Sequence, residues 1–283
     1  MLKWFVGAGI LLALSVLVAF ILFPRPQQAQ TRHLDVVYAV NSSRQTLDLY
    51  LPHGTEPFPL IVFIHGGGFM SGNKRGGNAP DIIPAGQKPF PAAADDVSRA
   101  IAFLRDEASA YGLDPNRFVA WGASAGGNLA AMAATRGAEC EATAVQAAVI
   151  WFAPIAFDQM DAQFEALGLD PKLGETNGPD SPESQYLGIA VGDPAAVDLV
   201  RAANQMTYIT EATHPMVIQN GTADRNIPIT QSEVFARSLT DALGQENVQF
   251  TTLEGAGHGG AEFMADANLD ASFAFLDHHL ADP

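Results

Sequence analysis

The segment that most constrains this chain is a serine between two glycines, placed where a predicted strand meets a predicted helix. Its residues are Gly122-Ala123-Ser124-Ala125-Gly126. An apolar stretch over residues 118–121 precedes it, and a run of small residues over 128–135 follows it. The glycines leave room for a sharp turn, so the serine hydroxyl projects at the helix N-terminus. A serine that only caps the helix would occupy the same place, but the strand–turn–helix context favours a nucleophile.

Apolar stretches alternate with helical patterns along most of the chain. Strands are predicted at residues 34–40, 46–51, 60–64, 118–121, 145–152, 216–219 and 248–253, and helices at 92–111, 128–135, 229–242 and 268–280. This alternation predicts an α/β fold with a mostly parallel sheet that helices cover on both faces. Residues 154–206 interrupt it with clusters of Gly, Pro, Asp and Ser, and are expected to form an irregular excursion over the sheet.

A serine hydroxyl needs a base and an orienting carboxylate to act as a nucleophile near neutral pH. His258 lies in a glycine-rich loop directly after a predicted strand, and Asp224 also follows a strand. Active sites of open α/β sheets collect at the carboxyl ends of strands, so these two residues are predicted to be the base and the acid. Glu254 is the alternative acid, although it is close in sequence to the histidine. The other histidines beyond the serine are interpreted as non-catalytic: His214, His278 and His279.

A third segment, His65-Gly66-Gly67-Gly68-Phe69, follows the predicted strand at residues 60–64. Acyl transfer generates an oxyanion, which preorganised backbone N–H groups stabilise. Glycines suit such a loop because no Cβ blocks the approach of a substrate. His65 precedes the serine in the chain and is interpreted as a residue that orders the loop.

Composition narrows the partners that the chain could have. It has 283 residues, a formal net charge of −16 and only 15 Lys+Arg. The length suits one large domain. Nucleic acid is not an expected partner, because no basic stripe is present to neutralise phosphates. The single cysteine, Cys140, excludes an intrachain disulfide and a Cys-based metal site, and is interpreted as a small core or surface residue.

The N-terminus carries an apolar run over residues 4–23, which is about 20 residues and long enough to cross a bilayer as a helix. We therefore expect residues 1–30 to form a transmembrane anchor and a linker, and residues 31–283 to form the globular domain. A cleaved signal sequence is the alternative, although its apolar region would be shorter, about 7–15 residues. In either case the domain is expected on the periplasmic or extracellular side, anchored to the membrane or secreted after cleavage.

Several segments together resemble a known family. They are His65-Gly66-Gly67-Gly68-Phe69, Trp121-Gly122-Ala123-Ser124-Ala125-Gly126-Gly127, Gly221-Thr222-Ala223-Asp224, Gly255-Ala256-Gly257-His258-Gly259 and Ser181-Pro182-Glu183-Ser184-Gln185-Tyr186-Leu187-Gly188. They are similar to α/β-hydrolase esterases of the hormone-sensitive-lipase type, and most of all to bacterial bifunctional acetylxylan/feruloyl esterase-like proteins.

The resemblance runs from about residue 34 to the C-terminus and implies an α/β-hydrolase fold. It also implies a serine carboxylester hydrolase without a metal or organic cofactor, acting on a small-molecule or saccharide-linked ester. Carried over residue by residue, it implies a triad of Ser124, Asp224 and His258. The oxyanion N–H groups would come from Gly67, Gly68 and Ala125.

The chain departs from the family pattern in two places. Asn220 stands where the family usually has a histidine. Residues 70–91 hold four prolines and four glycines where the family places a helix and a strand, so the fourth strand of the family's sheet is expected to be missing. We predict seven principal strands, with residues 46–51 hydrogen-bonded to residues 60–64. We also predict that residues 70–91 form a loop and that one wall of the pocket is open.

Two functions fit these observations. The first is a carboxylic ester hydrolase that forms an acyl-enzyme at Ser124. The second is a membrane-anchored, non-catalytic binding protein or remnant hydrolase that keeps these residues but lost activity with the missing segment. A covalent serine-directed phosphonate separates the two, because labelling that requires Ser124 supports the enzyme.

Overall fold

The computed structural model describes residues 31–75 and 89–281. Within these residues, no helix has the length and apolar character needed to cross a membrane. The apolar run over residues 4–23 lies outside the described residues, so the membrane anchor stays a prediction.

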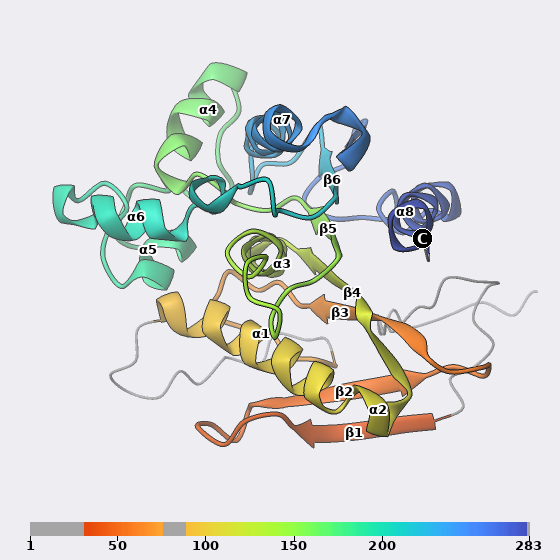
Figure 1. The fold of residues 1–283 in the computed structure, drawn as a ribbon. Coiled ribbons are helices and arrows are strands. Elements are labelled where there is room, and N and C mark those ends of the chain that lie inside the picture. Colours follow the sequence, from red (N-terminus) through yellow and green to blue (C-terminus); the bar gives the residue numbers. More distant parts are fainter. Residues whose placement is uncertain (1–30, 76–88, 282–283) are drawn as a thin grey trace, which may run out of the picture.

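Five strands form one parallel sheet in the order β3-β4-β5-β6-β7 (Figure 1). Their bounds are β3 Phe58–Ile64, β4 Leu113–Ala123, β5 Ala147–Trp151, β6 Met216–Gly221 and β7 Val248–Leu253. All five residues of β5, at the centre of the sheet, are buried. Because the strands are parallel, their carboxyl ends lie along one edge of the sheet, where loops from different parts of the chain can meet.

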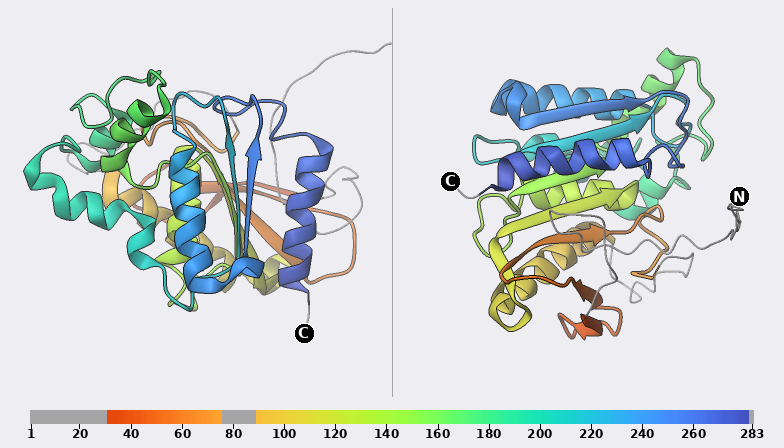
Figure 2. Two further views of the ribbon diagram at one scale, coloured as in Figure 1. Left: turned by 90° about the horizontal axis from the view of Figure 1, so that it is seen from above. Right: turned by 90° about the vertical axis from the view of Figure 1, so that its right-hand side faces the viewer.

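Helices cover both faces of this sheet, as the sequence predicted. The helices are α1 Pro89–Asp106, α2 Ala108–Tyr111, α3 Ala125–Thr135, α7 Thr230–Leu243 and α8 Asp266–Leu280. One apolar core joins α1, α3 and α7 to one face, for example through Leu104, Ala130 and Phe235. Helix α8 lies on the opposite face (Figure 2). A second core joins it to the sheet there through Leu276 and Leu280.

The predicted irregular excursion over residues 154–206 is instead a set of short helices beside α3 (Figure 1). They are η1 Phe157–Gln159, α4 Met160–Leu167, α5 Pro182–Leu187, η2 Pro194–Ala196, α6 Val197–Ala203 and η3 Gln205–Tyr208, and a further short turn, η4 Gln245–Asn247, precedes β7. Ser181 and Asp193 each precede a proline and cap the helix that follows. The polar residues and prolines that suggested a loop therefore begin helices, as residues of these types commonly do.

Two further strands, β1 Thr31–Val37 and β2 Thr46–Leu51, form a separate antiparallel hairpin. The described residues thus hold seven strands. The predicted total stays a prediction, because residues 76–88 of the segment in which the family's fourth strand was expected to be missing lie outside the described residues. The predicted pairing of β2 with β3 is wrong, because within the described part of the chain β2 is hydrogen-bonded to β1 alone and β3 to β4 alone. The predicted loop over residues 70–91 lies partly outside the described residues, and α1 already begins at Pro89.

Side-chain contacts explain why the hairpin does not join the sheet. The Tyr38 hydroxyl donates a 2.8 Å hydrogen bond to Asp96 of α1, and the Gln45 amide donates to the same carboxylate. Leu49 of β2 is buried in the core beneath α1. Backbone pairing would need β2 and β3 to lie about 4.8 Å apart, and these contacts hold the hairpin against α1 instead.

Candidate active site

Ser124 lies at the junction of β4 and α3 in a strained backbone conformation, with φ 57° and ψ −127°. Its N–H donates a 2.9 Å hydrogen bond to the carbonyl oxygen of Trp151 on β5. A Cβ on Gly126 would overlap the carbonyl oxygen of Ile64, and a Cβ on Gly122 would overlap that of Gly126. The two glycines therefore let α3 lie directly on the ends of the strands. A non-glycine residue with such a φ costs about 1–3 kcal/mol, which the surrounding packing has to offset.

The structure brings Ser124, His258 and Asp224 together in one hydrogen-bonded chain. The Oγ atom of Ser124 is 2.9 Å from Nε2 of His258, and Nδ1 of the same ring is 2.8 Å from Oδ2 of Asp224. Because a carboxylate accepts at Nδ1, this nitrogen carries the proton in the neutral ring, and Nε2 is left to accept from the serine hydroxyl. The arrangement can remove a proton from Ser124.

Two backbone groups fix the orientation of the Asp224 carboxylate, which is 1% exposed. Its Oδ1 atom accepts hydrogen bonds from the N–H groups of Asn226 at 2.8 Å and Ile227 at 3.0 Å. Only Oδ2 is then directed at His258. The alternative acid, Glu254, is exposed at the end of β7, and no ion pair with His258 is seen for it among the described residues.

The loops that carry Asp224 and His258 are joined to each other. The N–H of Ala223 donates to the carbonyl oxygen of Ala256 at 2.9 Å, and the N–H of Gly255 donates to Oγ1 of Thr222 at 2.8 Å. A Cβ on Gly221 would overlap the Ala256 carbonyl, so glycine is needed for this close approach. The loop after β7 therefore sits directly on the loop after β6, which explains why residues 34 positions apart meet.

The His258 ring packs on Phe152, a residue that the sequence did not single out. The two ring centroids are 4.6 Å apart with the rings inclined at 60°, and Phe263 lies behind Phe152. Phe152 has a positive φ of 38° just beyond the end of β5. No sequence pattern marks this residue, because its role depends on a backbone conformation that a phenylalanine rarely adopts.

The glycine loop after β3 lies beside Ser124. A Cβ built on Gly66 would be 3.3 Å from Cβ of Ser124. Gly67 and Gly68 both have positive φ, 123° and 61°. In the described part of the chain, no acceptor takes the N–H of either glycine. The N–H of Ala125, the first residue of α3, has no acceptor within the helix. These three N–H groups thus belong to the two segments that adjoin the side chain of Ser124.

His65 stays in the loop and does not reach the hydrogen-bonded chain. Its Nδ1 donates to the carbonyl oxygen of Gly66 at 2.7 Å, and its ring fills the space that a side chain at Gly72 would need. Of the other histidines, His279 contacts the Glu246 carbonyl from α8, and His214 precedes β6. Cys140 is exposed.

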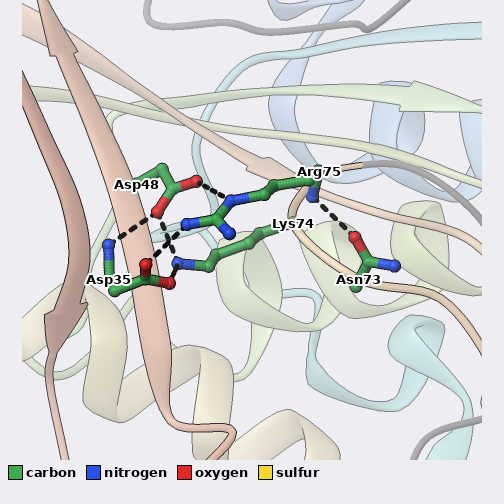
Figure 3. A network of polar contacts seen from close by, with 5 residues as sticks. All are labelled: Asp35, Asp48, Asn73, Lys74 and Arg75. Atoms are coloured by element: carbon green, nitrogen blue, oxygen red, sulfur yellow. Dashed lines mark hydrogen bonds and ion pairs between the residues drawn. The ribbon is translucent and has the colours of Figure 1, made fainter. Parts of the chain in front are cut away.

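A cluster of four charged residues, which we call the hairpin clamp, ties the end of this loop to the hairpin (Figure 3). It consists of Asp35, Asp48, Lys74 and Arg75. Lys74 binds both aspartates, at 2.5 Å to Asp35, and Arg75 binds Asp35 at 2.6 Å and Asp48 at 3.0 Å. The sequence analysis missed this cluster, because its members are far apart in the chain.

The clamp controls the ionisation of its two carboxyl groups. Hydrogen bonds from Lys74 and Arg75 lower the pKa of Asp35. Burial acts to raise the pKa of Asp48, but hydrogen bonds from the Asp35 backbone, Lys74 and Arg75 outweigh it and lower the pKa. Both aspartates are therefore anions near neutral pH, and the clamp carries two charges of each sign.

A parallel sheet with helices on both faces, and a serine, an aspartate and a histidine that follow β4, β6 and β7 in this order, define an α/β-hydrolase fold. More closely, the chain belongs to the BD-FAE family, whose profile matches residues 80–239.

Two curated relatives have names that describe ester-hydrolysing enzymes. Esterase LipQ of Mycobacterium tuberculosis is 28% identical over 260 residues, which cover 83% of this chain and 58% of LipQ. The isoprenylcysteine alpha-carbonyl methylesterase ICME of Arabidopsis thaliana is 29% identical over 230 residues, 74% of this chain and 51% of that protein. The chain thus spans about half the length of these relatives.

Solved structures agree with the α/β-hydrolase fold. A bifunctional GH43-CE protein of Bacteroides eggerthii superposes with a TM-score of 0.73 at 26% identity, covering 88% of this chain and 35% of the other. Esterase Est2 of Thermogutta terrifontis has a TM-score of 0.63 at 24% identity, with 89% and 94% covered, and is similar in fold. The α/β-hydrolase fold implied by the sequence resemblance is confirmed.

Proposed function

We propose that the chain is a carboxylic ester hydrolase that uses Ser124 as nucleophile, His258 as base and Asp224 as the orienting acid. One observation carries this proposal: the unbroken hydrogen-bonded chain from Ser124 Oγ through both nitrogens of His258 to Asp224, with distances of 2.9 Å and 2.8 Å. The names of the relatives support ester hydrolysis as the reaction.

In the first half of the reaction, Oγ of Ser124 attacks the ester carbonyl carbon while Nε2 of His258 takes the hydroxyl proton. Asp224 stabilises the imidazolium that forms. The tetrahedral intermediate collapses when the alkoxide departs with the proton from His258. The acyl group is then bound to the serine as an ester, and the alcohol is free.

Three backbone N–H groups are proposed to stabilise the oxyanion of each tetrahedral intermediate: those of Gly67, Gly68 and Ala125. Support comes from the closeness of the glycine loop to Ser124 and from the lack of any described acceptor for the two glycine N–H groups. Loss of one such donor typically lowers kcat by about 10²–10³.

In the second half, His258 takes a proton from a water molecule, whose oxygen attacks the acyl-enzyme. The second tetrahedral intermediate collapses, the carboxylic acid leaves, and the serine regains its proton from His258. Every step uses groups of this chain and water, so no cofactor is part of the proposed reaction.

The substrate is proposed to be a small-molecule or saccharide-linked ester. Solved neighbours include a carbohydrate esterase from gut microbiota and a Thermogutta terrifontis esterase bound to butyrate. Another neighbour is that esterase phosphonylated by sarin, which makes a phosphonate the natural probe for this chain.

The test is covalent labelling of the purified full-length chain with a fluorescent alkyl phosphonate, followed by ester hydrolysis assays. We expect stoichiometric labelling of the wild type and none of Ser124→Ala. Ser43→Ala, which removes an exposed hydroxyl in the hairpin turn, serves as the matched control and should label fully. Equal labelling of Ser124→Ala would exclude Ser124 as the nucleophile.

One structural observation favours the second candidate, a remnant hydrolase that binds without catalysis. Among the described residues, no strand is hydrogen-bonded to the edge of β3 that faces away from β4, and β3 leads directly into the glycine loop. If this loop cannot hold its donors, a chain with an intact hydrogen-bonded triad would still fail to label. A well-folded wild type that neither labels nor hydrolyses esters would support this candidate.

A further inference from the structure

Helix α5 forms a wall of the site next to the glycine loop. A Cβ built on Gly68 would be 3.4 Å from Cβ of Pro182, the first residue of the helix. One turn later, the Tyr186 ring stacks on Phe69 with centroids 3.9 Å apart and an angle of 12° between the planes. Ser181 caps the helix and accepts a hydrogen bond from Ser184 at 3.0 Å. The first turn of α5 is thereby fixed against the loop that holds Gly67 and Gly68.

Glu183 lies in this first turn and is buried, with 5% of its surface exposed. Burial raises the pKa of its carboxyl to about 7, against the effect of a hydrogen bond from its own backbone N–H. Asp161 raises the pKa further and His258 opposes it, so the group lies within electrostatic range of the catalytic histidine. Among the described residues, no side chain forms a hydrogen bond or ion pair with this carboxyl.

A buried carboxyl group normally has several hydrogen-bond partners, because an unpaired one loses its hydration without compensation. Glu183 has only its own N–H. Its neighbour Pro182 lies beside Gly68 in the glycine loop that adjoins Ser124, so the first turn of α5 borders the region where an ester bound at Ser124 has to be placed.

We propose that Glu183 is a specificity-determining residue whose carboxyl group hydrogen-bonds a hydroxyl of the bound ester, so that the site selects hydroxylated esters over their apolar analogues. The inference rests on the proposed function, because it places the hydroxyl relative to an ester at Ser124. A hydroxyl suits this position better than a cation does. With a pKa of about 7 the carboxyl is partly protonated near neutral pH, and a hydroxyl can bond to either form.

The test uses two acetate esters of similar size, 2-hydroxyethyl acetate and propyl acetate, which differ by a hydroxyl in place of a methyl group. The readout is the ratio of their kcat/KM values for the full-length chain. We expect the wild type to favour the hydroxylated ester by about 10- to 100-fold, as for a hydrogen bond to a charged group. Glu183→Leu should bring the ratio close to one. Glu183→Gln should give an intermediate ratio, because an amide still bonds a hydroxyl.

The ratio of the two kcat/KM values separates recognition of the hydroxyl from a structural role of Glu183, because damage to the fold lowers the rates for both esters together. Glu165→Gln, at an exposed glutamate on α4, is the matched control and should keep the wild-type ratio. A wild-type ratio near one, or an unchanged ratio in Glu183→Leu, would overturn the proposal.

Binding to the Ser124→Ala protein makes the outcome independent of turnover. Ligand-observed NMR should give tighter binding of 2-hydroxyethyl acetate than of propyl acetate, and Ser124→Ala/Glu183→Leu should lose the difference. If the wild type hydrolyses no ester but this difference is present, the proposed function fails and the recognition by Glu183 stands. Hydrolysis without any difference in binding or rate gives the opposite result.

Discussion

The five-stranded sheet and the N-terminal hairpin are held in the molecule by different interactions. Neighbouring strands of the sheet exchange backbone hydrogen bonds in register, and β5 at its centre is buried throughout. The hairpin is hydrogen-bonded to none of the described strands of the sheet. Apart from Leu49, which is buried in the core, it is held through polar side chains, namely the hairpin clamp and the contacts of Tyr38 and Gln45 with Asp96. Its apolar residue Val37 is 56% exposed.

This difference shows that the two regions should respond to different conditions. Backbone hydrogen bonds and apolar packing depend little on ionic strength, whereas ion pairs between partly exposed groups are screened by salt. The glycine loop connects the regions, since it begins at the end of β3 and continues into Lys74 and Arg75 of the clamp. Four predictions test this comparison.

The largest effect should follow from a change in the loop after β6 of the sheet. In Asp224→Asn, the N–H groups of Asn226 and Ile227 will hold the amide oxygen, so the NH₂ group faces His258 Nδ1. The ring must then carry its proton on Nε2 and cannot accept from Ser124. We expect kcat for ester hydrolysis to fall by about 10⁴, with stability nearly unchanged. Asp270→Asn, at an exposed site on α8, is the control. A loss below about 10-fold would refute the role of Asp224.

The second prediction concerns the buried carboxyl group of Glu183, which lies in helix α5 and outside the hairpin. The pKa of Glu183 is about 7 in the folded protein and 4.5 ordinarily. Between these values the folded state binds more protons than the unfolded state, so its stability falls as pH rises from about 4.5 to 7. Relative to Glu183→Gln, the wild type should lose up to about 3 kcal/mol of unfolding free energy over this range. Urea unfolding at several pH values, at low and at high salt, measures this change in the free energy of unfolding. Parallel curves for the two proteins would contradict the prediction.

The third prediction concerns a substitution that removes one charge from the hairpin clamp. The Asp48 side chain is 2% exposed, and Asp48→Asn removes the charge that it presents to Lys74 and Arg75. We expect the free energy of unfolding to fall by about 1–3 kcal/mol. Because the glycine loop loses an anchor, kcat should fall by about 10-fold, which is less than the loss of a whole oxyanion donor. Thermal unfolding and steady-state kinetics provide the measurements. An unchanged kcat in a destabilised protein would show that the clamp does not position the loop.

The smallest effect should come from salt alone. Raising NaCl to about 1 M shortens the Debye length to about 3 Å and should weaken the clamp by about 0.5–1 kcal/mol. Limited proteolysis between β1 and β2 should become faster, while hydrogen exchange in β5 stays slow. Asp48→Asn should lose most of this salt dependence. Equal salt effects on both regions would show that the hairpin and the sheet are not held by different interactions.

The sequence predicted the sheet better than it predicted the position of the hairpin. The turn at Ser124 and the strands that precede Asp224 and His258 were predictable, because local patterns of apolar residues and glycines determine them. The position of the hairpin was not, since it depends on pairs such as Asp35 and Lys74, which are 39 residues apart. Glu183 stood in a recognised motif, but its burial and the stacking of Tyr186 on Phe69 in the same helix are seen only in the folded chain. The catalytic roles and the membrane anchor stay predictions.

The strands beneath Ser124 also carry two of the three tryptophans of the chain, Trp121 and Trp151. Their rings meet edge to face, with centroids 5.2 Å apart, and both are buried. Trp121 lies in the strand that leads into Ser124, and the Trp151 carbonyl accepts the N–H of Ser124. Indole emission depends on the local electric field, so it provides a dye-free optical signal for events at the serine. Stopped-flow fluorescence can therefore test for the proposed acylation and deacylation in the unmodified protein.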